Sequence, residues 1–91
     1  SAPLNPQATF IPNVGWVFLW KLAREIADDE VVNESGCIRY ELTEASEEKL
    51  VLTEQWESEE LLAKHSKGTA VQDLNESLSA LLAEPVQLER L

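Results

Sequence analysis

Three stretches of this 91-residue chain decide its fold: GCIRYEL at residues 36–42, KLVLTEQWESEELLAKH at 49–65 and SALLAEPVQLERL at 79–91. The first alternates apolar and polar side chains, as a half-buried strand does, and the second begins with the same alternation before it changes to helical spacing. Two such strands joined by a short polar loop predict an antiparallel hairpin. The third stretch ends a helix before Pro85 and continues as a last strand.

A helix follows the second predicted strand directly. Ser58 is a suitable N-cap, and Glu59 and Glu60 fall in the first turn, where the helix dipole favours negative charge. Gly68 is expected to end this helix, and the capping box TAVQ at residues 69–72 is expected to start another. The expected buried stripe of the later helix is Val71, Leu74, Leu78 and Leu81.

The chain before Gly36 predicts one strand and one helix. Residues 7–11 form the strand, although prolines at positions 3, 6 and 12 surround it. Helical spacing extends from position 14 or 15 to Ser35, with Asn13 as a candidate N-cap and Gly36 as the end signal.

The order of these elements is β-α-β-β-α-β, the ferredoxin-like arrangement of an α+β protein with an antiparallel sheet. We expect a single domain over residues 1–91, with helices on one face of the sheet. A chain this short buries a small core, so a second subunit is the natural cover for the other face.

Alternation also predicts which side chains of the hairpin share a face. On the first strand, one face carries Ile38, Tyr40 and Leu42, and the other carries Cys37, Arg39 and Glu41. On the second strand, one face carries Leu50, Leu52, Glu54 and Trp56.

Composition excludes several classes of partner. The chain carries 17 acidic and 7 basic residues, a formal net charge of −10, so nucleic acids and anionic membrane surfaces are not expected partners. The single cysteine, Cys37, cannot form an intrachain disulfide. The most apolar run, residues 14–20, is too short to span a bilayer, and no secretory signal is visible. A cytoplasmic protein is the simplest expectation.

The three stretches resemble the antibiotic biosynthesis monooxygenase (ABM) family. The family's GC(L/I)RYEL strand matches residues 36–42, its EEWESEEALxAH segment matches 54–65, and its LLAEPxxxxRL ending matches 81–91. The resemblance implies a homodimer of ferredoxin-like domains, the dimeric α+β barrel. Several members oxidise aromatic molecules without a bound cofactor. The resemblance therefore implies a cofactor-independent monooxygenase that oxidises a polycyclic aromatic or quinol-type small molecule with molecular oxygen.

Two departures from the family pattern leave other functions open. WVFLW follows Gly15 where members usually carry charged residues, and Ala70-Val71 stands where many members carry a second His-Phe pair. The alternatives are a non-redox isomerase or lyase on the same fold, and a non-catalytic module that binds a small molecule or a partner. One histidine and one cysteine do not form a typical zinc site, so we expect neither a metal nor a cofactor.

Three residues are candidates for the chemistry. His65 is the only imidazole and is a candidate general base, or else a helix-end histidine stabilised by the dipole. Trp56 matches a family tryptophan and would hold an aromatic ring, or else anchor the core. Tyr40 would donate to a quinone oxygen, or else pack in the core with its hydroxyl at the rim. Arg39 would orient an anionic substrate, or else pair with Glu54.

Aromatic side chains near the N-terminus are candidates for substrate binding. Trp16 and Trp20 are four residues apart and so lie on one side of the predicted helix. Together with Phe18 and with Phe10 of the predicted strand, they would line an aromatic cavity between helix and sheet. The alternative is that they pack in the core or at a dimer interface.

Overall fold

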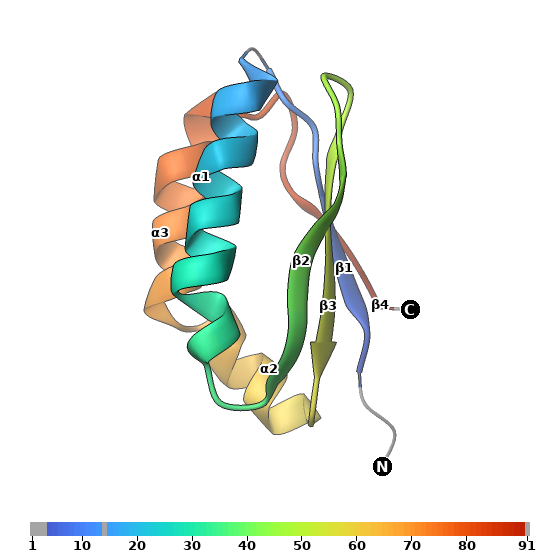
Figure 1. Ribbon diagram of the computed structural model, residues 1–91, viewed down its shortest axis with the longest axis vertical. Helices are drawn as coiled ribbons and strands as arrows, with labels where there is room; N and C mark the ends of the chain where they lie inside the picture. The colour runs from blue at the N-terminus through green and yellow to red at the C-terminus, as the bar shows by residue number, and fades with distance from the viewer. Residues whose placement is uncertain (1–3, 14, 91) are drawn as a thin grey trace.

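The computed structural model describes residues 4–13 and 15–90 of the chain. Within these residues the elements are β1 (Pro6–Phe10), α1 (Trp16–Asp29), η1 (Val31–Asn33), β2 (Cys37–Ala45), β3 (Leu50–Trp56), α2 (Glu59–Ser66), α3 (Thr69–Leu78), η2 (Ser79–Leu81) and β4 (Gln87–Arg90). Figure 1 shows two layers, with the helices on one face of the sheet and the other face bare. The predicted α+β, ferredoxin-like architecture is confirmed.

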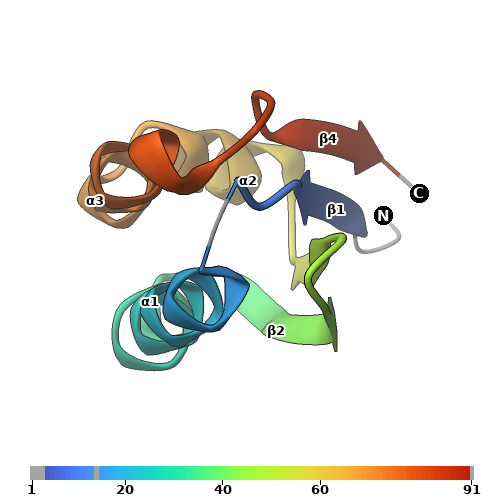
Figure 2. The ribbon, with the colours of Figure 1, turned by 90° about the horizontal axis from the view of Figure 1, so that it is seen from above.

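The sheet has the strand order β2-β3-β1-β4, and every neighbouring pair is antiparallel. β1 is therefore a central strand despite its proline. Pro6 is tolerated because it is the first residue of the strand, where a missing ladder hydrogen bond does least harm. The view from above in Figure 2 shows β4 beside β1, so the last strand brings the C-terminal segment back to the first strand.

The helix α1 starts later and ends earlier than the sequence predicts. Gly15 occupies the N-cap position with φ 63°, so the expectation that Asn13 caps the helix is wrong. The backbone N–H of Asn13 instead donates to the carbonyl of Leu81 at 2.7 Å, which fixes the chain before it turns into α1. At the other end, α1 stops at Asp29 and η1 fills the remaining distance to Gly36, which adopts the expected positive φ of 84°.

The predicted capping box makes Thr69 the N-cap of α3, but the N-cap lies one residue earlier. Gly68 is the N-cap of α3, and no side chain caps it, so Thr69 is the first helical residue. The buried side of α3 consists of Ala70, Leu74 and Leu78. Val71 is only partly buried, so the expected stripe is correct at its two central leucines.

A β-bulge at the start of β2 changes the face of the sheet to which its side chains point. The register shifts between Cys37 and Arg39, so the extra residue leaves the ladder. Ile38 is consequently 49% exposed, and the expectation that it shares the face of Tyr40 is wrong. Tyr40 itself is buried and lies opposite Glu54 on β3.

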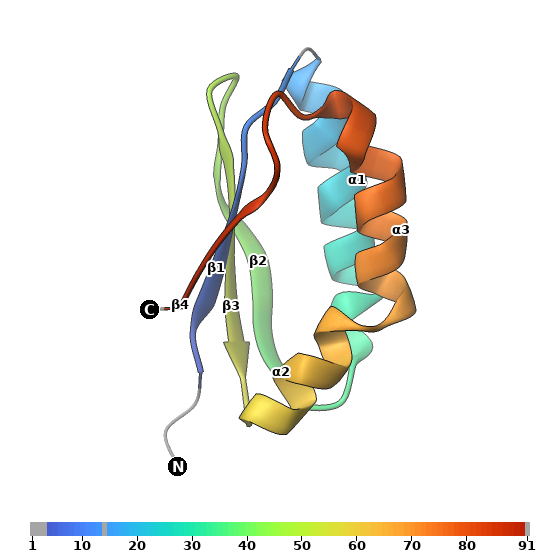
Figure 3. The ribbon, with the colours of Figure 1, turned by 180° about the vertical axis from the view of Figure 1, so that it is seen from behind.

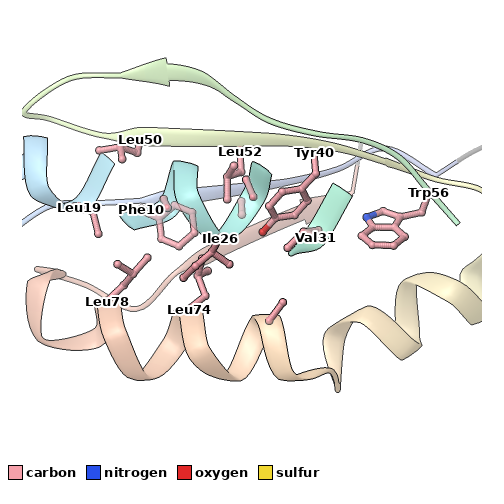
Figure 4. Close-up of a cluster of buried hydrophobic side chains, with 14 of the residues drawn as sticks. Phe10, Leu19, Ile26, Val31, Tyr40, Leu50, Leu52, Trp56, Leu74 and Leu78 are labelled. Carbon is pink, nitrogen blue, oxygen red and sulfur yellow. The ribbon is translucent and has the colours of Figure 1, made fainter. Parts of the chain in front are cut away.

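The core lies between the two layers, as Figure 4 shows. The face of β3 predicted from alternation is buried over its whole length, including the carboxylate of Glu54. Phe10 from β1 and Leu74 and Leu78 from α3 meet this face. Figure 3, from behind, shows α3 running alongside α1, and the two helices contact each other along this length. Among the described residues, no helix is both long enough and apolar enough to cross a membrane.

Candidate active site

The three residues predicted to carry the chemistry lie together at one end of the core. The imidazole of His65, in the last turn of α2, stacks on the indole of Trp56 with ring centroids 4.5 Å apart and an interplanar angle of 30°. The ring of Tyr40 meets the same imidazole edge-on at 5.6 Å and 66°. All three side chains are buried, and Figure 4 shows Tyr40 and Trp56 projecting toward the helical layer.

Two carboxylates flank the imidazole on its two nitrogen atoms. The Nδ1 of His65 lies 3.0 Å from Glu34 Oε1, which is hydrogen-bonding distance. The Nε2 lies 4.0 Å from Glu54 Oε1. That oxygen accepts a hydrogen bond of 2.9 Å from the Nε1–H of Trp56. Because an ionised carboxylate can only accept, the contact with Glu34 favours the tautomer with hydrogen on Nδ1 and a lone pair on Nε2.

Local structure explains how these groups meet. The pairing of β2 with β3 sets Tyr40 directly opposite Glu54, so both point to the inner face. The helix α2 begins at Ser58, whose Oγ accepts from the backbone N–H of Leu61 at 3.2 Å. Two turns later, the same helix places His65 beside Tyr40 of β2 and Trp56 of β3.

Burial shifts the acid–base properties of the site. Burial is the main cause that raises the pKa of Glu54, and the nearby charge of Glu34 raises it further. The Trp56 hydrogen bond and His65 oppose this rise in the pKa. Burial, followed by the charges of Glu54 and Glu34, also raises the pKa of Tyr40, so its phenol stays protonated and can donate a hydrogen bond.

A cavity of about 450 Å³ adjoins this cluster, between the sheet and the helices α2 and α3. Tyr40, Glu54 and His65 line it together with mainly apolar side chains, which include Ala8, Phe10, Leu62, Leu74, Val86 and Leu88. The register places Glu54 at the Pro6 end of β1, so the ionisable groups gather at one end and the apolar ones at the other. This size and this distribution of polarity suit a small, largely apolar ligand that carries one polar end.

A second cleft of about 320 Å³ lies on the other side of His65. Its lining includes Glu30, Glu34 and Lys64 beside the imidazole. His65 thus forms part of the wall between an inner cavity and an outer, more polar cleft.

The structure places the remaining candidate residues differently from the sequence prediction. Phe10 lines the cavity, but Trp16 and Trp20 border two separate clefts at the edges of α1, so the expectation of one shared aromatic cavity is wrong. Trp16 lies beside Pro12 and Glu47, and Trp20 lies beside Leu42, so neither indole reaches the cavity that Phe10 lines. Trp56 is fully buried behind His65 and does not line the cavity, so it supports the site rather than facing a ligand.

Arg39 and Cys37 lie outside the cluster of ionisable groups. Arg39 pairs with Glu41 on its own strand, and the expected pairing with Glu54 is wrong because Glu54 faces inward. Cys37 is partly buried, and burial raises the pKa of its thiol, which keeps it in the unreactive protonated form.

The sequence prediction missed two residues of the site, Glu34 and Glu54. The alternation of β3 contained a signal for Glu54, because that pattern placed a charged residue among Leu50, Leu52 and Trp56 on one face. A buried carboxylate in an apolar row is a candidate functional group. Glu34 carried no such signal, since 31 positions separate it from His65 in the chain.

Comparison with known proteins assigns the family. The sequence profile described as antibiotic biosynthesis monooxygenase matches residues 20–77, more than half of the chain. The chain belongs to the antibiotic biosynthesis monooxygenase family. The matched part of this ABM domain includes Glu34, Tyr40, Glu54, Trp56 and His65. A search of curated proteins gives no significant match to the ABM domain described here.

Solved structures share the fold over nearly the whole chain. PA3566 from Pseudomonas aeruginosa has a TM-score of 0.84 at 22% identity, covering 100% of this ABM chain and 93% of its own. Rv0793 from Mycobacterium tuberculosis has a TM-score of 0.76 at 26% identity, covering 99% and 93%. A conserved protein from Methanosarcina mazei has a TM-score of 0.85 at 20% identity, covering 98% and 90%.

Proposed function

We propose that this chain is a cofactor-independent monooxygenase that oxidises a polycyclic aromatic or quinol-type small molecule with molecular oxygen. One observation carries the proposal: an apolar cavity of about 450 Å³ ends at a buried group of Tyr40, Glu54 and His65. Membership of the ABM family supports the same class of reaction.

The proposed reaction requires a binding site for the ring, a hydrogen-bond donor and a group that removes a proton. The cavity takes up a planar ring and excludes water from it, with Phe10 and the leucines of α2 and α3 as apolar walls. The protonated phenol of Tyr40 donates a hydrogen bond to an oxygen of the substrate. His65 assists removal of the substrate's O–H proton, which leaves an electron-rich anion that can pass an electron to oxygen. Trp56 holds the imidazole from behind by stacking.

The charge of the site also limits the substrate. Two carboxylates flank the imidazole, and the chain has a net charge of −10. Arg90 also lines this end of the cavity, but it is paired with Glu59, so we expect the two carboxylates to dominate and to repel an anionic ligand. We therefore propose that the substrate enters as a neutral phenol, quinol or anthrone and ionises only after it binds.

Oxygen consumption by the purified protein tests the proposal. A panel of anthrones and quinols is incubated with the wild type and with His65→Ala and Trp56→Phe variants. We expect uptake above a protein-free blank, and a decrease of about 10²–10⁴-fold in His65→Ala, the usual contribution of a general base. Trp20→Phe is the matched control, since Trp20 is aromatic but borders a different cleft. Uptake equal to the blank for every compound contradicts the proposal.

The buried pair of Glu54 and His65 also favours a second candidate function. A carboxylate and an imidazole facing one cavity are sufficient to move a proton within a small carbonyl compound, without any oxidant. The isomerase alternative predicts product under strict anaerobiosis at the aerobic rate. The monooxygenase proposal predicts none under those conditions.

We also propose that two copies of the chain associate through the bare face of the sheet. Side chains on this face, such as Gln7, Thr9 and Thr53, are partly buried and polar. A cross-strand contact of 2.8 Å joins the hydroxyl groups of Thr43 and Thr53 there. The small size of the domain favours a partner on this face.

A further inference from the structure

We infer that Glu54 accepts the substrate's proton in the cavity, and that His65 carries it to the outer cleft, where Glu34 stabilises the resulting imidazolium. This inference rests on the proposed function and makes it more specific. His65 then acts as the middle of a relay, and Glu54 is the catalytic residue that contacts the substrate.

The position of Glu54 is the first observation. Its side chain is only 5% exposed, yet it lines the cavity in a row of β3 that is otherwise apolar. Burying a carboxylate in such a row is unfavourable, and one hydrogen bond from Trp56 Nε1 offsets little of that cost. Within residues 4–13 and 15–90, only Oε1 receives a hydrogen bond, which leaves Oε2 available to a ligand. Burial raises the pKa of this carboxyl group, which makes it a stronger base than an exposed glutamate.

The position of His65 is the second observation. The imidazole lines both the inner cavity and the outer cleft, so it is the ring through which a proton can leave the core. Nδ1 contacts Glu34 at 3.0 Å, and this contact leaves the lone pair of Nε2 on the side of Glu54. The separation of 4.0 Å between Nε2 and Glu54 Oε1 is about 1 Å longer than a hydrogen bond. Catalytic hydrogen bonds of this kind often shorten only when the substrate is bound.

The geometry of Glu34 is the third observation. One oxygen contacts His65, and the other, Oε2, is buried without a hydrogen-bond partner among the described residues. A positively charged neighbour stabilises a carboxylate that has an oxygen without a hydrogen bond more than it stabilises one whose two oxygens both accept hydrogen bonds. Glu34 therefore stabilises the protonated imidazole.

Proton transfer begins at the hydroxyl group of the substrate. The O–H bond of the substrate breaks, its electron pair stays on the substrate oxygen, and the proton adds to the Glu54 carboxylate. The Glu54 carboxylic acid then passes this proton to the lone pair of His65 Nε2, which restores the carboxylate. The imidazolium releases its Nδ1 proton to water in the outer cleft beside Glu34, and Nε2 keeps the proton that came from the substrate. Oxygen, the co-substrate of the proposed function, accepts electrons from the anion and adds to it; one oxygen atom stays on the product and the other leaves as hydroxide. This hydroxide takes the Nε2 proton through Glu54 to become water, and Nδ1 regains a proton from the cleft, which restores the starting tautomer.

Other charged groups around the relay must be considered in any pH experiment. The titratable groups that face Glu54 and His65 from the surrounding elements are Glu30, Glu34, Cys37, Tyr40, Lys64, Glu89 and Arg90. Arg90 is already paired with Glu59 at the surface. The experiments change Glu54, His65 and Glu34, which contacts His65 directly.

The kinetic experiment uses Glu54→Gln, which keeps the shape of the side chain but cannot accept a proton. For the substrate that the wild type oxidises, we expect kcat to fall about 10²–10⁴-fold with KM within about threefold of the wild type, and the acidic limb of the pH–rate profile to disappear. Glu54→Asp should recover part of kcat. Glu57→Gln, an exposed neighbour on the same segment, is the control and should match the wild type. Retention of wild-type kcat by Glu54→Gln overturns the inference.

A second measurement does not depend on turnover. Because His65 is the only histidine, a ¹⁵N-detected long-range spectrum reports its tautomer without ambiguity. We expect hydrogen on Nδ1. The ¹³C-carboxyl titration of Glu54, assigned by its loss in Glu54→Gln, should lie above that of an ordinary glutamate. His65→Gln should raise this Glu54 pKa, and Glu34→Gln should lower it, because the two neighbours act in opposite directions.

The two measurements separate the possible failures. If the wild type consumes no oxygen with any compound, the proposed function fails. The tautomer of His65 and the titration of Glu54 then test the relay on their own. Hydrogen on Nε2, or a Glu54 titration that neither variant moves, overturns the relay whether or not oxygen is consumed. If His65→Gln does not fold, the effect of Glu34→Gln on the pKa of Glu54 shows whether the groups of the relay are coupled.

Discussion

At the scale of single residues, the site depends on a carboxylate that the fold keeps out of water. Glu54 lies between Leu52 and Trp56 on the inner face of β3, and it is held by the indole N–H of Trp56. That hydrogen bond orients one oxygen, while the ring that supplies it stacks on His65. Trp56 therefore fixes the base and the relay together, and its own position behind them explains why it does not face the cavity.

The raised pKa of Glu54 predicts a pH dependence of stability. The unfolded chain loses this proton near the ordinary value of 4.5, whereas the folded chain keeps it to higher pH. The folded state therefore binds more protons in this range, and the free energy of unfolding falls as pH rises through it. Stability from this group is fully present below the ordinary value and is lost above the raised one. Glu54→Gln should remove this loss, and thermal unfolding of both proteins at steps from about pH 4 to about pH 8 measures it.

The difference between the two proteins isolates Glu54, since the other carboxyl groups titrate in both. Glu57→Gln serves as the control, because an exposed carboxylate should leave the pH profile unchanged. A wild-type-minus-variant curve that is flat, or that rises with pH, would contradict the prediction.

At the scale of elements, the site depends on how closely α2 approaches the start of β2. Gly36 lies where the chain enters the strand, with φ 84°. A Cβ atom at this position would lie 2.4 Å from Cδ1 and 2.7 Å from Cβ of Leu61, which is on α2. The missing side chain therefore lets the helix pack against the strand entry. This packing brings His65, one turn further along, next to Glu34, two residues before Gly36.

Gly36→Ala should destabilise the protein by about 2–4 kcal/mol, because backbone strain and a clash with the body of Leu61 act together. Gly15→Ala is the matched control. It also has a positive φ, of 63°, but apart from its chain neighbours no atom of the described residues lies within 4 Å of the added Cβ, so backbone strain alone should lower the stability, by about 1–2 kcal/mol. Urea denaturation measures both changes. Equal losses of stability in the two variants would contradict the prediction, because they would show that a Cβ atom at position 36 does not disturb the packing of α2.

At the scale of the whole molecule, a small domain of 10.2 kDa leaves one face of its sheet without helices, as Figures 1 and 3 show. Polar but partly buried side chains cover that face, and the charge of −10 on each chain opposes association. The proposed pairing must therefore be specific, and it should strengthen as salt screens the repulsion.

Sedimentation equilibrium should give a mass about twice that of one chain. Gln7→Lys puts a charge from each chain into the proposed interface, where it must lose its water, so we expect the dissociation constant to increase about tenfold or more. Gln72→Lys adds the same charge on the exposed side of α3 and should leave association unchanged. A monomeric wild type, or equal effects of the two lysines, would exclude this interface.

Much of the fold could be predicted because its signals are local. Alternation in residues 50–56 placed Leu50, Leu52, Glu54 and Trp56 on one face, and all four are buried. The break between α2 and α3 at Gly68 and the positive φ of Gly36 also follow from short-range chemistry. The facing of Ile38 could not be predicted, since the bulge that exposes it is set by pairing with β3 rather than by β2 itself.

The candidate site was predicted in part for the same reason. His65 was a candidate because it is the only imidazole, Trp56 because it matches a family tryptophan and Tyr40 because of its phenol on the predicted strand, and the structure brings the three together. The role of Glu34 depends on a contact between distant segments, which no local pattern contains. The start of α1 is apolar on every side, so helical spacing could not decide which partner Trp16 and Trp20 would face.

The two register shifts in β2 have a consequence for changes in chain length. Each shift adds one residue to β2 relative to β3, between Cys37 and Arg39 and again between Leu42 and Glu44. Deleting one residue from an ordinary strand turns every later side chain to the opposite face. Deleting Ile38 would instead restore a regular ladder and leave Tyr40 opposite Glu54. Deletion of a single residue at either point can therefore be accommodated while Tyr40 stays opposite Glu54 in the ladder.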